Sequence, residues 1–548
     1  TSPQFIGCYG NKDAHTPHID ELAREGVRFI SAFSTNTVCS PSRTALITGV
    51  STFETGTGHH RSKIPLPAFM HGFPYYLRQA GYYTSNNHKT DYNLPAEKSF
   101  IEEAWNESSK DGGWWGRKPG QPFFAVFNFM DSHQSRTMTN PYPQYRENVL
   151  DQLPEPARIR ENDFEMPPFF SDTDEMRRQF ARVYNSISLT DYKIGKLLER
   201  LERDKLSDST IIFFFSDHGE GIPRGKTNGI GLGYRIPFII WVPPMYRKLS
   251  PWAASTVTPE LISFRDLAPT LISLAGGPVP QYMKGRVLMG SRREKPADYI
   301  ELSSDRSDNG IDMVRSITDG RYVYSRNYMP FMPEARYVNY MEQGEIKKAM
   351  RRDLARGRLN ALQESLFAPR PAEYLFDIRR DVWETVNLGK DPKFQSVVRK
   401  MRKRLDREVM RSRDVMFLPE YELTRISAAT IPYEYRLNDK DYPLKEIYEA
   451  ASLSGFRDRT SGRRQSELLK SGNPIIRYWA ITGLRSQTPE TVGQFSQQVL
   501  EAVNDRYPPV SITAAAIAYD VLADTTAAEH LKKYAMHPDA DLALMSIN

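Results

Sequence analysis

The sequence is 548 residues long, more than one hydrophobic core usually serves, so we expect two or three domains. Its 73 Lys and Arg residues against 67 Asp and Glu residues give a net charge of only +6, which argues against a nucleic-acid-binding protein. No run of about 18 apolar residues is present, so we expect no membrane span, and two cysteines are too few for a disulfide framework or a cysteine-rich zinc site.

The first part of the chain alternates short apolar runs with stretches of helical periodicity. The clearest predicted strands are residues 26–34, 122–129, 209–215 and 236–242, and the clearest predicted helices are residues 20–25 and 186–203. This alternation indicates an α/β domain around a mostly parallel sheet, which we assign to residues 1–297. Ligands bind such sheets beyond the carboxyl ends of the strands, so polar residues that follow strands are candidates for a site.

A smaller α+β subdomain is predicted for residues 298–417. Its pattern contains hairpin-like pieces at 313–325 and a basic helix at 396–412. Residues 418–442 are rich in Pro, Tyr and charged residues, which predicts a linker.

The last region, residues 443–548, is predicted to be helical. Short, Ala-rich helix starts follow Pro474, Pro508 and Pro538, which indicates degenerate helical repeats of the HEAT type. Unrelated helices that begin with proline in the first turn are the alternative.

A cysteine stands at the start of a predicted helix. Pro41 suits the first turn of that helix, so the side chain of Cys39 is expected near unpaired backbone amides and the positive end of the helix dipole. Arg43, one turn further on, adds a fixed cation with several donors. The segment therefore predicts an anion site that contains a reactive group.

The run Cys39-Ser-Pro-Ser-Arg43, followed by Leu46 and Gly49, resembles the signature of the formylglycine-dependent sulfatases, which have an alkaline-phosphatase-like core. In that family a formylglycine-generating enzyme oxidises the cysteine to an aldehyde, which is then hydrated. One hydroxyl attacks sulfur and the other expels sulfate. The resemblance implies that Cys39 is the precursor of the nucleophile and that the substrate is a sulfated carbohydrate. A buried structural cysteine is the alternative.

The resemblance also implies a divalent cation. Asp217 and His218 follow the predicted strand 209–215 and match the family's ligand motif, and a carboxylate beside an imidazole suits such an ion. We expect calcium because the available ligands are mostly oxygen. In the family two further acidic ligands end a strand that precedes the opening block. That pair does not appear before Thr1, so we expect either that it lies outside the sequence or that the metal site is incomplete.

Further site residues are implied by the same resemblance. Lys226 matches a sulfate-binding lysine, and His133 matches a histidine that contacts the sulfate and can protonate the leaving oxygen. Lys89 aligns with the lysine of a Lys-x-His motif, but Asp91 stands where the histidine should be, which suggests a contact to a sugar hydroxyl instead.

Two candidates at the mouth of the site rest on weaker patterns. His60 and Arg224 are predicted to bind substrate there, although solvated surface positions would explain both residues equally well.

Within the family, the opening block and residues 326–330 look most similar to bacterial heparan N-sulfatase-like enzymes. This similarity implies a sulfated polysaccharide such as a glycosaminoglycan, and a periplasmic or secreted location. Two other functions stay open. One is a phosphodiesterase or phosphonate monoester hydrolase with the same nucleophile and metal, and the other is an inactive glycan-binding protein that uses its helical repeats.

Overall fold

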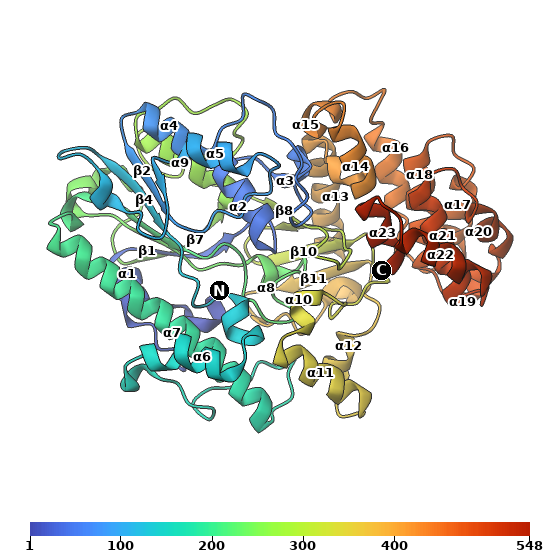
Figure 1. Ribbon diagram of the computed structural model, residues 1–548, viewed down its shortest axis with the longest axis horizontal. Coiled ribbons are helices and arrows are strands. Elements are labelled where there is room, and N and C mark those ends of the chain that lie inside the picture. The colour runs from blue at the N-terminus through green and yellow to red at the C-terminus, as the bar shows by residue number, and fades with distance from the viewer.

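A computed structural model describes all residues from Thr1 to Asn548. Figure 1 shows an α/β region on one side, a sheet with flanking helices in the middle and a group of helices at the opposite end. None of the helices combines the length and the apolar character needed to cross a bilayer.

Two sheets form the α/β region. The first has the order β5 (Ile212–Phe215), β6 (Phe238–Trp241), β1 (Val27–Phe33) and β7 (Thr256–Ser263). The second is parallel throughout, with β2 (Tyr83–Asn87) between β3 (Glu107–Ser108) and β4 (Phe123–Phe127). The four predicted strands are confirmed as β1, β4, β5 and β6.

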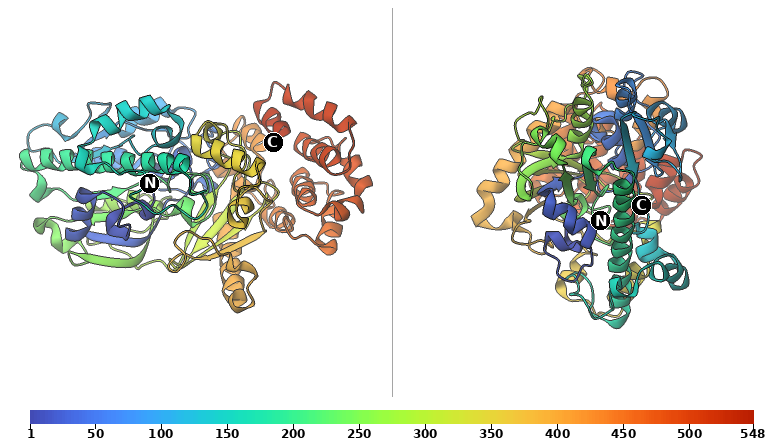
Figure 2. Two further views of the ribbon diagram at one scale, coloured as in Figure 1. Left: turned by 90° about the horizontal axis from the view of Figure 1, so that it is seen from below. Right: turned by 90° about the vertical axis from the view of Figure 1, so that its left-hand side faces the viewer.

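Helices cover both sheets. The predicted helices are confirmed within α1 (Pro17–Glu25) and α7 (Asp174–Arg203), and α7 runs along the whole α/β region (Figure 2). The other helices of this region are α2 (Cys39–Thr48), α3 (Thr52–Thr55), α4 (Phe73–Gln79), α5 (Glu97–Ala104), α6 (Tyr142–Asn148), α8 (Gly231–Tyr234) and α9 (Leu267–Leu274).

The prediction of a mostly parallel sheet is wrong for the first sheet. Strand β6 runs antiparallel to both β1 and β5, and only β1 and β7 are parallel there. The connection from β5 to β6 holds only the four-residue helix α8, so it contains no long helix of the kind that usually links parallel neighbours. The sheet is therefore mixed, and this connection carries Asp217, His218 and Lys226.

Strands β4 and β5 are each the edge strand of their sheet. Both line one cavity of about 760 Å³, whose wall is mostly apolar and includes Phe127, Phe214 and Leu198. The same cavity reaches polar side chains at the carboxyl ends of the strands, among them Asp217 and Lys226. The polar end of this cavity is therefore the candidate site.

The middle region is an antiparallel sheet in the order β11 (Glu373–Asp377), β10 (Tyr322–Asn327), β9 (Val314–Thr318) and β8 (Ile300–Ser304). The predicted hairpin is confirmed as β9 and β10, and the basic helix as α13 (Gln395–Ser412). Three shorter helices, α10 (Asn339–Glu342), α11 (Glu345–Ala355) and α12 (Ala361–Ser365), lie between β10 and β11 in the chain.

Residues 418–442 do not form the predicted linker. They contain α14 (Glu420–Ser427) and α15 (Pro432–Tyr435), and the side chains of Leu423, Ile426 and Tyr442 are buried in a core. Leu423 and Ile426 are three positions apart, so they share one helix face, which packs inward. The polar composition of the segment concealed this apolar face.

The remaining helices form the C-terminal end. They are α16 (Leu444–Ala451), α17 (Arg459–Leu468), α18 (Pro474–Arg485), α19 (Pro489–Gly493), α20 (Ser496–Ala502), α21 (Pro508–Asp520), α22 (Thr526–Ala535) and α23 (Ala540–Ile547). Trp479 of α18 belongs to the same buried cluster as Tyr328, and its indole donates a hydrogen bond to the carbonyl of Phe417 at 2.8 Å. These helices therefore share a core with the middle region.

Candidate active site

Cys39 is the first residue of α2, directly beyond β1 and its following loop, as the sequence predicts. The helix ends at Gly49, whose φ of 68° is a left-handed conformation that glycine adopts without strain. Only 3% of Cys39 is exposed. The start of the helix thus presents one reactive side chain in a nearly closed site.

Basic groups surround the sulfur of Cys39. Its Sγ lies 3.2 Å from Nε2 of His218 and accepts a hydrogen bond from Nζ of Lys226 at 3.6 Å. Burial alone would raise the pKa of the thiol, but Lys226, Lys89 and His218 together hold it well below its usual range. The site therefore stabilises negative charge at residue 39.

Asp217 balances this positive charge. Its carboxylate lies 3.5 Å from both Nζ of Lys89 and Nη1 of Arg43. Burial raises its pKa, but His218, Lys89 and Arg43 outweigh burial and hold the pKa well below its ordinary value. Asp217 is thus ionised at neutral pH.

Arg43 also fixes the geometry of the site. Its guanidinium donates to the carbonyls of Thr90 and Lys89, at 2.8 and 2.6 Å, and to Oδ1 of Asn128 at 2.6 Å. These acceptors follow β2 and β4, so Arg43 ties α2 to the ends of two strands. This arrangement holds Lys89 beside Asp217.

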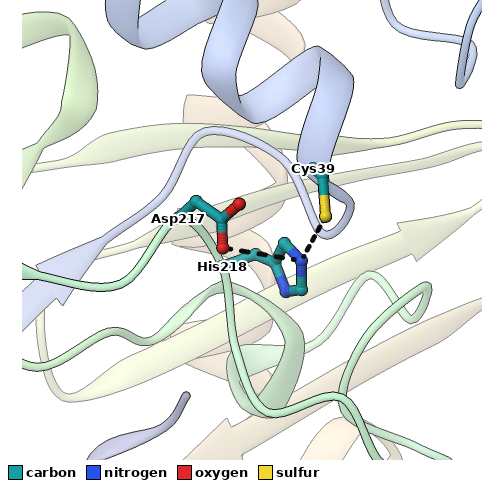
Figure 3. Close-up of side chains that lie close together, drawn as sticks. All are labelled: Cys39, Asp217 and His218. Carbon is teal, nitrogen blue, oxygen red and sulfur yellow. Dashed lines mark hydrogen bonds and ion pairs between the residues drawn. The ribbon is translucent and has the colours of Figure 1, made fainter. Parts of the chain in front are cut away.

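Three side chains could hold a metal ion together. Ligand atoms of Cys39, Asp217 and His218 all lie within 4.8 Å of one another, and Figure 3 shows the three side chains converging. A carboxylate and an imidazole fit a divalent cation. Calcium binds roughly six to eight oxygen atoms, so these side chains fit part of such a site and not all of it.

His133 lies beyond β4 and lines the polar end of the cavity. Its Nδ1 is 2.9 Å from Oγ of Ser135. Burial lowers the pKa of His133, and its interaction with Cys39 opposes that effect only in part. The imidazole is therefore mostly neutral at pH 7 in the free protein.

Arg224 is not brought to the site, in contrast to the prediction. Its guanidinium lies 2.7 Å from Glu334, donates to the carbonyls of Trp383 and Glu384 at 3.0 and 2.7 Å, and covers the ring of Phe169 at 4.0 Å. These contacts hold the guanidinium away from Cys39, so Arg224 instead anchors the loop that carries Lys226.

His60 and Asp91 lie at the rim of the site. Nδ1 of His60 accepts a hydrogen bond from the backbone N–H of Asp308 at 3.3 Å, so its proton resides on Nε2. Burial, with Lys226 and Arg61 nearby, lowers the pKa of His60 to about 3. Asp91 lies 3.7 Å from Arg61 and 4.0 Å from Lys89. His60 thus offers a neutral hydrogen-bond donor, and the carboxylate of Asp91 offers an acceptor.

The sequence interpretation missed Tyr340. Its ring centroid lies 5.1 Å from Nζ of Lys226, and the ring packs edge-on against His60. Tyr340 belongs to α10, and no local pattern in the sequence marks it.

The chain is similar to known sulfatases in sequence. A family model described as Sulfatase matches residues 1–277. An ulvan-active sulfatase of Formosa agariphila is 33% identical over 507 residues, which cover 84% of this chain and 83% of that protein. The N-sulphoglucosamine sulphohydrolase of Homo sapiens is 26% identical, with 73% and 86% covered.

Solved structures share the fold. A phosphonate monoester hydrolase of Silicibacter pomeroyi matches with a TM-score of 0.51 and 17% identity, covering 74% of this chain and 92% of that one. The protein yidJ of Bacteroides fragilis matches with a TM-score of 0.52 and 18% identity, covering 77% and 95%.

Proposed function

Because the chain belongs to the sulfatase family, we propose that it hydrolyses sulfate esters or sulfamates on a sulfated carbohydrate, with residue 39 as its nucleophile. One observation carries this proposal most directly. Cys39 lies at a helix start with Lys226 at 3.6 Å and His218 at 3.2 Å, so the position of the nucleophile is also a site for an anion.

The nucleophile is proposed to be formylglycine formed from Cys39 by a maturing enzyme. One hydroxyl of its hydrate attacks sulfur and the bond from sulfur to the sugar oxygen breaks, which leaves residue 39 as a sulfate ester. The second hydroxyl then loses its proton, the aldehyde re-forms and sulfate departs. A thiol has no second hydroxyl and could not complete this cycle.

The other side chains divide the remaining tasks. Lys226 and Lys89 bind the sulfate oxygens and stabilise the charge that develops on them. His133 protonates the sugar oxygen as it leaves. The support for these roles is that all three side chains line the polar end of one cavity.

Asp217 and His218 are proposed to hold a calcium ion. When bound, the ion supplies positive charge that polarises a sulfate oxygen. Other groups must complete the coordination, and the cavity between β4 and β5, which reaches Asp217, is where they would enter.

The substrate is proposed to be a polymeric or oligomeric sulfated glycan. Support comes from the names of two relatives, which act on ulvan and on N-sulphoglucosamine. A periplasmic or secreted location follows from such a substrate, and the helices α16–α23 are proposed to be HEAT-like repeats beside the enzyme. Sulfate release from a panel of defined sulfated oligosaccharides tests the proposal, with Cys39→Ala as the control variant.

A phosphodiesterase or phosphonate monoester hydrolase is the second candidate, because the same nucleophile and cations suit a phosphoryl group. Steady-state comparison of a sulfate ester with the matching phosphate diester separates the two. A higher kcat/KM for the phosphate diester would reverse the assignment, and glycan binding without release of either product would indicate an inactive binding protein.

A further inference from the structure

Tyr340 comes from the middle region of the molecule but contacts the proposed sulfate-binding lysine. Nζ of Lys226 lies 5.1 Å from the centroid of its ring and 3.6 Å from Sγ of Cys39. A cation at this distance from an aromatic ring is attracted by the ring's electron-rich face. One ammonium group therefore contacts both residue 39 and Tyr340.

Tyr340 is fixed by two hydrogen bonds and one ring contact. Its hydroxyl forms a hydrogen bond with Oγ of Ser307 at 2.9 Å, and its carbonyl accepts one from Nε2 of Gln134 at 3.2 Å. Its ring packs edge-on against His60, with centroids 6.3 Å apart. Ser307 follows β8 and Gln134 is next to His133, so the ring is fixed relative to both the middle region and the α/β region.

The lysine, by contrast, has few partners. The hydrogen bond to Cys39 is the one that its ammonium makes in the structure, and no carboxylate lies within ion-pair distance of it. Only 4% of Lys226 is exposed. A long lysine side chain has many rotamers, and one sulfur contact fixes them poorly.

We propose that Tyr340 is a positioning residue that holds the ammonium of Lys226 beside residue 39, ready for a sulfate oxygen. The inference rests on the proposed function only in assigning the anion to sulfate. Tyr340 lies on α10 in the middle region, whereas the other proposed site residues belong to the α/β region. The middle region would therefore help to position a residue of the site.

A double-mutant cycle tests the coupling. Affinity for inorganic sulfate is measured by calorimetry for the full-length matured wild type, Tyr340→Phe, Tyr340→Leu, Lys226→Met and the variant that combines Tyr340→Leu with Lys226→Met. We expect Tyr340→Leu to weaken binding by about 2- to 30-fold, the range of cation–π interactions, while Tyr340→Phe keeps the ring and binds like wild type. Once Lys226 is Met, Tyr340→Leu should have no further effect. Independent, multiplicative losses, or equal losses for Phe and Leu, would overturn the proposal.

A crystal structure of Tyr340→Leu gives a readout that does not depend on sulfate chemistry. The ammonium of Lys226 is expected to leave its place beside residue 39, and in Tyr340→Phe to keep it. An unmoved Lys226 in Tyr340→Leu would refute the positioning role even in a fully active sulfatase. A displaced Lys226 in a protein without sulfatase activity would uphold that role and refute the proposed function instead. If Tyr340→Leu does not fold, Tyr340→Met is read by the same criteria.

Discussion

Nζ of Lys226 lies 3.6 Å from Sγ of Cys39, although the two residues are 187 positions apart in the chain. Cys39 begins α2, whereas Lys226 lies in the connection between β5 and β6. The fold therefore places a permanent cation against the proposed nucleophile. In the unmodified chain, interaction with Cys39 outweighs burial and raises the pKa of Lys226, so the lysine is protonated at neutral pH.

Replacement of Lys226 by methionine is expected to lower kcat/KM for a sulfate ester by about 10²- to 10³-fold, as is usual for the loss of one group that stabilises developing charge. Lys248→Met is the matched control, because Lys248 is exposed. Steady-state kinetics of both variants provide the measurement. Similar losses in the two variants would contradict the role of Lys226.

His133→Ala is expected to reduce hydrolysis of sugar sulfates far more than hydrolysis of an activated aryl sulfate, whose leaving oxygen needs little protonation. Relative kcat/KM on the two substrate types is the measurement. Equal losses would make His133 a binding residue and make His218 the next candidate for the acid.

The pH dependence of kcat/KM gives an independent check on His133. The acid must be protonated to act, and burial lowers the pKa of His133 below its ordinary value of 6.5. The activity on sugar sulfates should therefore decline with rising pH, with a midpoint below 6.5, and this limb should be absent in His133→Ala. If the decline of activity with rising pH persists in His133→Ala, another titratable group causes it.

Asp217→Asn is expected to abolish turnover and bound metal while the protein remains folded, because the carboxylate is the stronger ligand of the proposed pair. Asp208→Asn is the control, since Asp208 is exposed near the other end of β5. Metal content by elemental analysis and activity after chelation are the measurements. Full activity in Asp217→Asn would remove the metal from the mechanism.

Much of the site could be predicted because its residues follow strands. Cys39, Lys89, His133 and Asp217 come after β1, β2, β4 and β5, and each stands in a local motif. The reversed direction of β6 could not be predicted, because an apolar run of four residues has the same composition in either direction. Tyr340 reaches the site only through packing between two regions, which no short pattern encodes.

Arg224→Ala is expected to destabilise the fold rather than weaken substrate binding. Its loss leaves Glu334 buried without its partner, and breaking a buried pair in this way costs about 3–5 kcal/mol. Thermal unfolding and KM of the folded protein are the measurements, with Arg463→Ala as the control, because Arg463 is exposed on α17. A raised KM with unchanged stability would restore Arg224 to the substrate site.

Residue 39 of the active enzyme is expected to be formylglycine made from Cys39. Mass spectrometry of the tryptic peptide between Arg28 and Arg43, taken from enzyme whose activity has been measured, tests it most directly. We expect a peptide lighter than the thiol form, in a fraction that rises in proportion to specific activity. A fully active preparation in which residue 39 is entirely a thiol would contradict it.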